Sequence, residues 1–576
     1  MKINENLNRL ASILLAKSII DLYPNVIIGE STITEDGFRY SFKLPTDVKI
    51  SIKDFNKIKK QMQKNIDRNY EISYESLSYE QASKLFASNP YKLALLAKDQ
   101  ENGIIHLGND FVDLSANLQI TKLSSIKFIE LSNVSGCHFK GENSNEQLIA
   151  IDGFAFDNAK DLETFKAELQ DRAERDHRKI GANLELFCFS DKIGQGLPIW
   201  LDNGTNIKFE IENYCKELMQ KNEYHFVQTP VLGTTELYKI SGHWDHYREN
   251  MFTPFKVENE EFVLKPMNCP HHIIVYKQKP HSYQELPYRI AEFGIQHRYE
   301  SSGSLTGLER VRQMQLVDTH TVLMHEQIRD EIKKVYSMIL EAHKTLGTSI
   351  YSLELSLHDP KDKAKFFDND KMWANAEKQL REALKSLKVP FKEVIGEAAF
   401  YGPKIDMQMK TALGHIVTIS TIQLDFLLPE RFNLEYIDSE GKKARPVFIH
   451  AGIIGTFERY LAILLEQTKG ILPFWLSPNQ VIFLPVLPEK HGKFAKKLQL
   501  KLLNMGIRAR IDNSNERLSK KIREAQIKKI PYQVIIGDEE MNSKNISYRE
   551  YGKEESIKLP FSAFARLLKG RINKKN

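Results

Sequence analysis

The chain has 576 residues, of which 41% are hydrophobic and 27% are charged, and its formal net charge is +6 at pH 7. This length predicts three or four domains of roughly 100 to 200 residues each, with the composition of an ordinary globular protein. The four cysteines form no CxxC pair, which argues against a disulfide framework and favours the reducing cytoplasm. The mild positive charge permits a nucleic-acid partner without requiring one. No stretch has the roughly 20 apolar residues of a membrane span.

Residues 1–160 mix helical and strand-like patterns. We predict helices over 7–22 and 52–68 and strands over 37–44 and 126–134, which together indicate an α+β domain. Residues 161–181 are highly charged, with apolar residues at helical spacing, and predict one amphipathic connecting helix that ends at Gly181.

Residues 291–320 predict a long antiparallel hairpin with a Ser/Gly-rich loop over 301–307. Side chains alternate across a strand, so Arg298 and Glu300 are expected on one face of the first arm. The residues expected to share one face of the return arm are Arg310, Arg312, Met314, Leu316, Asp318 and His320. Such a face is either the solvated side of a hairpin or a ligand face, because arginine matches phosphate and carboxylate oxygens in pairs.

The segment 450–467 predicts an apolar helix after Gly455 that contains one cation, Arg459. A buried cation needs a partner, so this arginine favours the ligand interpretation. From residue 476 strands and helices alternate, which predicts an α/β domain with a largely parallel sheet. Its many lysines and arginines suit either a phosphate-facing surface or a merely solvated one.

The hairpin and helix together resemble motifs 2 and 3 of the class II aminoacyl-tRNA synthetases, with Arg298 and Glu300 as the Arg-x-Glu pair and Arg459 as the motif 3 arginine. The segments KPMNCPHH (265–272), SGHWDHYRENMF (241–252), EAAFYGPKIDM (397–407) and TIQLDF (421–426) are similar to signatures of the threonyl-tRNA synthetase family. The resemblance implies a multidomain α+β protein. Its parts would be an N-terminal α+β editing-like domain (1–160), a connecting helix (161–181), an antiparallel-sheet class II catalytic domain (182–475) and an α/β anticodon-binding domain (476–576).

The family implies an ATP-dependent ligase that joins threonine to tRNA(Thr), with Mg²⁺ accompanying ATP. The implied catalytic residues are Arg298, Arg459, His243 and Lys404. The implied ATP-binding residues are Arg298, Glu300, Arg310, Met314, Thr421 and Arg459. The implied threonine-binding residues are Met267, Asp318, Tyr401 and Gln423, and the implied anticodon-binding residues are Asn515, Glu540 and Arg549.

Cys269, His320 and His450 form no compact ligand motif, and each alone fits a small buried hydrophobe or a satisfied polar residue. The resemblance instead implies that the three bind one zinc ion per chain. Three protein ligands leave the metal an open position, which is the pattern of a functional rather than a structural site.

Some positions depart from the family. Met314 replaces a phenylalanine that stacks on adenine, while Leu316 and Thr418 replace glutamines. We expect these changes to tune activity and not to abolish it. In the N-terminal domain, Arg9, Ile13, Ser115 and Gln119 stand where the family has its His, His, Cys and His editing residues. We therefore expect a scaffold remnant that does not edit seryl-tRNA, and the ubiquitin-like domain that usually precedes it is expected to be missing.

The segment 207–232 resembles motif 1, which implies a homodimer, although any surface helix packed on a sheet fits the same pattern. Two rival functions stay open at this point. A prolyl or other class II synthetase would share motifs 2 and 3 but not the Cys269, His320 and His450 trio. A synthetase-like RNA-binding or regulatory protein with a dead active site would have lost Arg298, Glu300 or Arg459, and all three are present.

Overall fold

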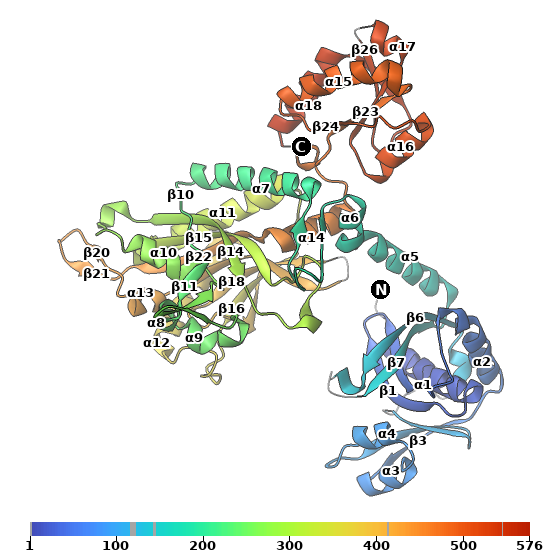
Figure 1. The fold of residues 1–576 in the computed structure, drawn as a ribbon. Helices are drawn as coiled ribbons and strands as arrows, with labels where there is room; N and C mark the ends of the chain where they lie inside the picture. Colours follow the sequence, from blue (N-terminus) through green and yellow to red (C-terminus); the bar gives the residue numbers. More distant parts are fainter. Residues whose placement is uncertain (1–2, 116–121, 142–145, 412–413, 544, 576) are drawn as a thin grey trace. The chain divides into compact units, whose positions relative to one another are not determined.

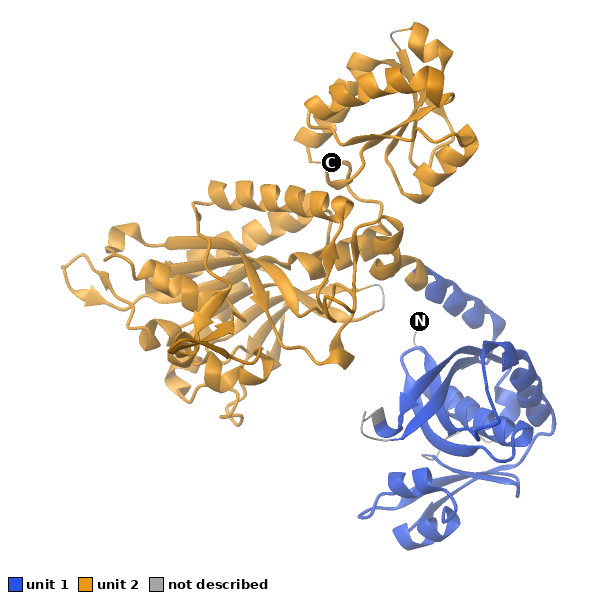
Figure 2. Ribbon diagram, viewed as in Figure 1, with its two compact units in different colours: residues 1–171 blue, residues 172–576 orange. Residues whose placement is uncertain are grey.

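The computed structural model describes residues 3–115, 122–141, 146–411, 414–543 and 545–575. It divides into two compact units, residues 1–171 and residues 172–576 (Figure 2). The first unit thus runs beyond the predicted boundary at residue 160, into the connecting helix. Among the described residues, no helix is long and apolar enough to cross a bilayer.

The first unit is built on a four-stranded antiparallel sheet with the order β1-β2-β7-β6 (Figure 1). Its strands are β1 (Ile27–Thr34), β2 (Gly37–Lys43), β6 (Phe128–His138) and β7 (Gln147–Phe156). The helices α1 (Glu5–Leu22) and α2 (Phe55–Asp67) share one apolar core with this sheet. A smaller antiparallel sheet contains β3 (Ile72–Leu77), β4 (Asn102–Leu107) and β5 (Phe111–Leu114). The predicted α+β character is confirmed.

The connecting segment forms two helices, α5 (Ala159–Arg175) and α6 (His177–Asn183). The carboxylate of Asp176 accepts a hydrogen bond from the Arg178 N–H at 2.9 Å and thereby starts a new helix. Gly181 lies inside α6 and ends nothing, so the prediction of one continuous helix ended by glycine is wrong.

An eight-stranded sheet forms the centre of the second unit, with the order β10-β14-β15-β22-β19-β18-β16-β17. It is antiparallel from β14 to β16, which confirms the predicted antiparallel-sheet core. The strand bounds are β10 (His225–Phe226), β14 (Tyr288–His297), β15 (Gln313–Leu323), β16 (Ser352–Leu357), β17 (Lys392–Ile395), β18 (Lys404–Lys410), β19 (Ile416–Asp425) and β22 (Val447–Thr456). The helices that share its core are α7 (Asp202–Lys221), α11 (Ile328–Leu346), α12 (Asp370–Leu387) and α14 (Phe457–Thr468).

The predicted hairpin exists, but its strands are shorter than predicted. Arg298 and Glu300 follow the end of β14, and Arg310 and Arg312 precede β15, so their predicted places on strand faces are wrong. Met314, Leu316, Asp318 and His320 occupy every second position of β15, as predicted for residues that share one face of a strand. Because the three arginines and Glu300 lie in the loop between the strands, the two-residue alternation of a strand does not determine the direction of their side chains.

The C-terminal part of the second unit has its own apolar core. Its sheet has the order β24-β23-β25-β26-β27, in which β23 is parallel to β24 and β25 while the other two pairs are antiparallel. The predicted α/β layer is confirmed, whereas the sheet is mixed and not largely parallel. The bounds are β23 (Val481–Pro485), β24 (Ala509–Ile511), β25 (Tyr532–Ile536), β26 (Asn545–Glu550), β27 (Ser556–Pro560), α15 (Pro488–Asn504), α16 (Leu518–Ile527), α17 (Asp538–Asn542) and α18 (Phe561–Asn573).

Candidate active site

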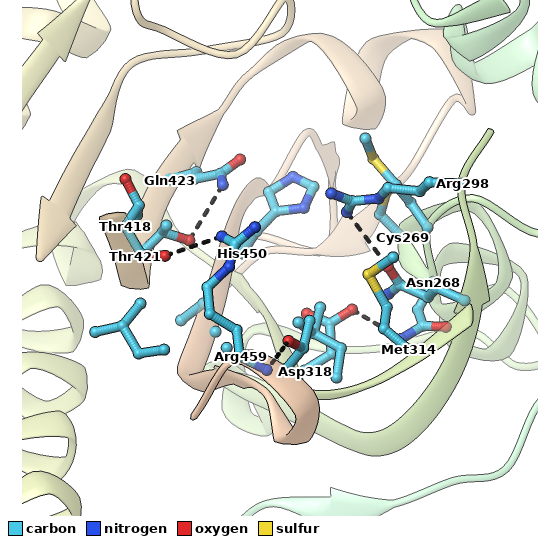
Figure 3. Close-up of a pocket in the computed structure, with 18 of the residues that line it drawn as sticks. Asn268, Cys269, Arg298, Met314, Asp318, Thr418, Thr421, Gln423, His450 and Arg459 are labelled. Atoms are coloured by element: carbon cyan, nitrogen blue, oxygen red, sulfur yellow. Dashed lines mark hydrogen bonds between the residues drawn. The ribbon is translucent and has the colours of Figure 1, made fainter. Parts of the chain in front are cut away.

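A cavity of about 230 Å³ lies against β15, β19 and β22, beside the loop that joins β14 to β15 (Figure 3). It gathers most of the predicted site residues from distant parts of the chain. Those that line it are Met267, Cys269, Arg298, Glu300, Arg310, Met314, Asp318, His320, Tyr401, Thr421, Gln423, His450 and Arg459. Leu316 and Thr418, which depart from the family pattern, also line it.

Cys269, His320 and His450 are buried, and their potential ligand atoms all lie within 4.8 Å of one another. His320 and His450 are direct partners across β15 and β22. Cys269 begins α10 (Cys269–Tyr276). One thiol and two imidazoles are a donor set that suits Zn²⁺.

Further hydrogen bonds orient both histidines toward this common point. His450 Nε2 lies 2.8 Å from the carboxylate of Asp425, and His320 Nδ1 lies 2.7 Å from His272 Nδ1. His272 Nε2 in turn lies 2.9 Å from Glu292. These bonds leave His450 Nδ1 and His320 Nε2 facing each other at 3.0 Å. Outer carboxylates of this kind fix the ring orientation of metal-binding histidines, so the residues present fit a metal ion.

Arg459 lies near the start of α14, and its partners are backbone carbonyls. Its guanidinium donates to Glu309 O at 3.0 Å and to Thr418 O at 3.1 Å. Burial lowers the pKa of Arg459, and the nearby charges of Arg298 and Arg310 lower it further. Three arginines around one cavity therefore repel one another, and an anion between them would relieve that repulsion.

One carboxylate and one carboxamide contact the other two arginines near this loop. Arg310 forms an ion pair with Glu300 at 3.7 Å. The Arg298 guanidinium donates to Gln296 Oε1 at 3.4 Å. These contacts hold Arg298 and Arg310 at the cavity.

Another part of the cavity is lined by polar side chains that hydrogen-bond to one another. The Asn268 amide donates to Asp318 at 2.9 Å, and burial raises the pKa of Asp318 to about 6. The Tyr401 hydroxyl donates to Gln423 Oε1 at 2.6 Å, and the Tyr401 ring stacks on His450. The result is a small polar pocket next to the three candidate metal ligands.

Two predicted residues stand just outside the lining. His243 is fully buried, with Nε2 at 3.2 Å from Met267 Sδ and 3.6 Å from Cys269 Sγ, and burial lowers its pKa to about 3. Lys404 is the cross-strand partner of Gln423, but its ammonium group pairs with Asp406 at 2.9 Å.

Several contributors were missed by the sequence reasoning. Asn268 precedes Cys269 in the Asn-Cys-Pro turn, and Gln296 lies two residues before Arg298, so both neighbours could have been suspected. Glu309 takes part through its backbone oxygen, which no side-chain pattern reveals. The supporting pair His272 and Glu292 became visible only in the folded chain.

The predicted anticodon residues lie in the C-terminal part of the second unit. Asn515 is exposed, whereas Glu540 is buried and accepts from Ser547 Oγ at 2.7 Å and from the Gly537 N–H at 2.9 Å. Arg549 on β26 faces Gln533 on β25. Arg549 Nε and both amide atoms of Gln533 are buried without a hydrogen-bond partner in the described part of the chain.

The positions expected to carry editing chemistry in the first unit hold other side chains. Arg9 and Ile13 lie on α1, where Ile13 is fully buried in the core, and Ser115 follows β5. Gln119 lies outside the described residues.

Comparison with protein families places the fold and this site in a known class. Residues 253–468 match the model described as tRNA synthetase class II core domain (G, H, P, S and T), and residues 480–571 match the model described as Anticodon binding domain. The fold and site therefore define a class II aminoacyl-tRNA synthetase.

The chain is 47% identical to the threonine–tRNA ligase of Ureaplasma parvum over all of both chains. It is also 47% identical to that of Staphylococcus carnosus, over 94% of this chain and 84% of the relative. A solved structure described as the RNA binding domain of threonyl-tRNA synthetase from Cryptosporidium parvum matches with a TM-score of 0.65 and 38% identity, covering 69% of this chain and 98% of that one. The chain belongs to the threonine–tRNA ligase family and is an ATP-dependent aminoacyl-tRNA ligase.

Proposed function

We propose that ATP and threonine react in the cavity to form threonyl-adenylate and pyrophosphate, and that the threonyl group then moves to the terminal ribose of tRNA(Thr). The observation that carries this proposal is the gathering of three arginines and a Cys/His/His group around one cavity. Catalysis of this kind depends mainly on positioning and on electrostatic stabilisation of phosphate charge.

Arg298 would bridge the α-phosphate and the threonine carboxylate, because a guanidinium can donate to two oxygens at once. Arg459 and Arg310 would neutralise the β- and γ-phosphates, together with the Mg²⁺ that accompanies ATP. Glu300 and Thr421 would hold the adenosine, with Met314 against the adenine ring. The lowered pKa of Arg459, caused by burial and by Arg298 and Arg310, supports an anionic ligand here.

Asp318 would receive the amino and hydroxyl groups of threonine, and Met267, Tyr401 and Gln423 would complete the pocket. Lys404, opposite Gln423 on the next strand, would act near the reacting carboxylate. His243 would help proton movement during transfer. Burial lowers its pKa to about 3, so the imidazole is neutral at physiological pH.

Cys269, His320 and His450 would hold one zinc ion, which supplies a Lewis acid for the amino and hydroxyl groups of the substrate. Asp425 and the pair His272 and Glu292 would fix the two imidazoles in the required orientation. The donor set and its outer hydrogen bonds support this assignment.

The N-terminal unit would not hydrolyse seryl-tRNA. Arg9, Ile13 and Ser115 offer neither an imidazole nor a thiol at the positions where the family's editing chemistry is expected. Ile13 in particular is packed fully inside the core and cannot contact a substrate. Correction would then be left to a separate deacylase or to tolerance of errors.

The enzyme would act in the cytoplasm as a homodimer joined through the motif 1 region. In such a dimer the partner chain would cover Phe209 on α7, which leaves 55% of its surface exposed. The C-terminal domain would read the anticodon of tRNA(Thr) through Asn515, Glu540 and Arg549. The orphaned Nε of Arg549 is consistent with a base as its missing partner.

The deciding experiment is ATP–pyrophosphate exchange with each of the twenty amino acids in turn. We expect exchange with threonine, weaker exchange with serine and very little with valine. Equal exchange with proline, or none with any amino acid, would overturn the proposal.

A further inference from the structure

The short helix α6 places one histidine between the two ATP-binding motifs. His177 is buried, and both of its ring nitrogens are engaged. Nδ1 lies 2.7 Å from the carboxylate of Glu466, near the end of α14. Nε2 accepts the backbone N–H of Leu308, in the loop that leads to β15, at 3.1 Å. No residue implied by the family resemblance, and no step of the proposed mechanism, uses this side chain.

These two contacts define one tautomer of the ring. The Leu308 N–H can only donate, so Nε2 must carry the lone pair. The ring proton therefore lies on Nδ1 and points to the Glu466 carboxylate. The imidazole thus joins a donor in the loop to an acceptor on the helix, and no apolar side chain could make either bond.

The residues that follow Leu308 lead directly to the phosphate end of the cavity. The Glu309 carbonyl accepts from Arg459, and Arg310 pairs with Glu300. Because α14 carries Arg459 near one end and Glu466 near the other, the contacts close into a ring. It runs from Glu466 through His177 to the loop, and from the loop through Arg459 back to α14.

The loop also approaches the imidazole too closely for any side chain. A Cβ on Gly307 would lie 2.3 Å from His177 Nε2, and the backbone there has φ = +48°. Glycine is favoured at this position for both reasons. The loop backbone therefore packs directly against the imidazole ring of His177.

We propose that His177 is a positioning residue for ATP: it fixes the segment 307–310 so that Arg459 and Arg310 meet the phosphates. The proposal rests on the placement of ATP in this cavity, argued above. It does not require the metal ion or the tRNA. It assigns the connecting helix α6 a part in nucleotide binding.

The test is threonine-dependent pyrophosphate exchange by the full chain, with KM measured separately for ATP and for threonine. His177→Phe keeps a ring of similar shape and removes both nitrogens, so we expect KM for ATP to rise roughly ten- to a hundred-fold. KM for threonine should stay at the parental value. His177→Gln keeps one acceptor and one donor and should restore most of the ATP affinity.

A matched control is His281→Phe, because His281 is also buried and also bonds a glutamate, Glu285, at 2.9 Å, but away from the cavity. It should lower the melting temperature without changing KM for ATP. A His177→Phe enzyme with the parental KM for ATP and a similar loss in melting temperature would overturn the proposal.

If His177→Phe does not fold, Gly307→Ala is the alternative test, because its added methyl group pushes the loop away from the imidazole of His177. A raised KM for ATP supports the positioning role, and a parental value overturns it. Absence of threonine-dependent exchange in the parent enzyme would overturn the proposed function itself. An active parent with an unaffected His177→Phe variant overturns only the role of His177.

Discussion

His320 Nε2 and His450 Nδ1 face each other at 3.0 Å across paired strands, and each ring is held from behind by a hydrogen bond of its other nitrogen. Either a shared proton or a metal ion bound by both nitrogens satisfies this pair. With Cys269 as the third donor, the arrangement suits a metal ion such as Zn²⁺.

We therefore predict one zinc ion per chain in the purified enzyme and less in Cys269→Ser, measured by elemental analysis. Cys215→Ser is the matched control, because Cys215 is fully buried in the core of the same unit and outside the cavity. The loaded enzyme should reject valine by on the order of ten-thousand-fold, since a site built for a hydroxyl strongly excludes the isostere without one. A metal-free preparation that activates threonine and excludes valine would contradict the assignment.

The outer shell of this site can be tested separately. Glu292→Gln keeps a hydrogen-bond acceptor for His272 but removes the negative charge that orients the His272 ring toward His320. Metal affinity should therefore fall roughly 10- to 100-fold. The measurement is competition with a chelator. Glu331→Gln is the control, because Glu331 is another buried glutamate that pairs with a cation, Arg289. Equal metal affinity in Glu292→Gln and the parent would show that His272 and Glu292 only support the fold.

The phosphate assignments predict that Arg298→Ala and Arg459→Ala each reduce threonine-dependent pyrophosphate exchange by roughly 100-fold or more, as expected when an electrostatic donor to developing charge is removed. Both variants should keep the fold. Arg445→Ala is a fair comparison, since Arg445 likewise donates to a backbone carbonyl, Pro429 O at 2.8 Å, but does not line the cavity. Parental exchange by either cavity variant would refute the role given to that arginine.

The C-terminal domain should affect only the second reaction. Arg549→Ala removes a proposed base contact, so kcat/KM for charging of tRNA(Thr) should fall roughly ten- to a hundred-fold. Pyrophosphate exchange needs no anticodon and should keep its rate, which makes it the internal control. A variant that charges tRNA(Thr) normally would remove Arg549 from the anticodon site.

Fidelity gives the last prediction. Serine shares the amino and hydroxyl groups of threonine and lacks only a methyl group, a difference of roughly 1 to 3 kcal/mol. The enzyme should therefore form measurable seryl-tRNA, and Ile13 and Ser115 should leave it uncleared. The measurement is the decay of pre-formed seryl-tRNA(Thr) in the presence of the purified full chain. Decay well above the spontaneous rate would mean that other residues of the N-terminal unit edit.

The sequence by itself was enough for the family, the antiparallel core and most of the residues that line the cavity. Short local signatures such as the Asn-Cys-Pro turn and the Arg-x-Glu pair carry that information in consecutive residues. The apolar helix that contains Arg459 was also predicted from the sequence, because its apolar residues recur at helical spacing and Arg459 is the one cation among them.

The tertiary structure decided what depends on long-range contacts. Periodicity placed Arg298 and Arg310 on strand faces, but the strands end earlier and the loop brings the two arginines to the cavity. The break at Asp176 depends on a side-chain cap, which the amphipathic pattern across 161–181 does not register. Two sets of hydrogen bonds join residues far apart in the chain. In one, Glu292 and His272 orient His320; in the other, the Leu308 N–H donates to His177. Hydrogen bonds between such residues leave no periodic trace in the sequence, so only the folded chain could reveal them.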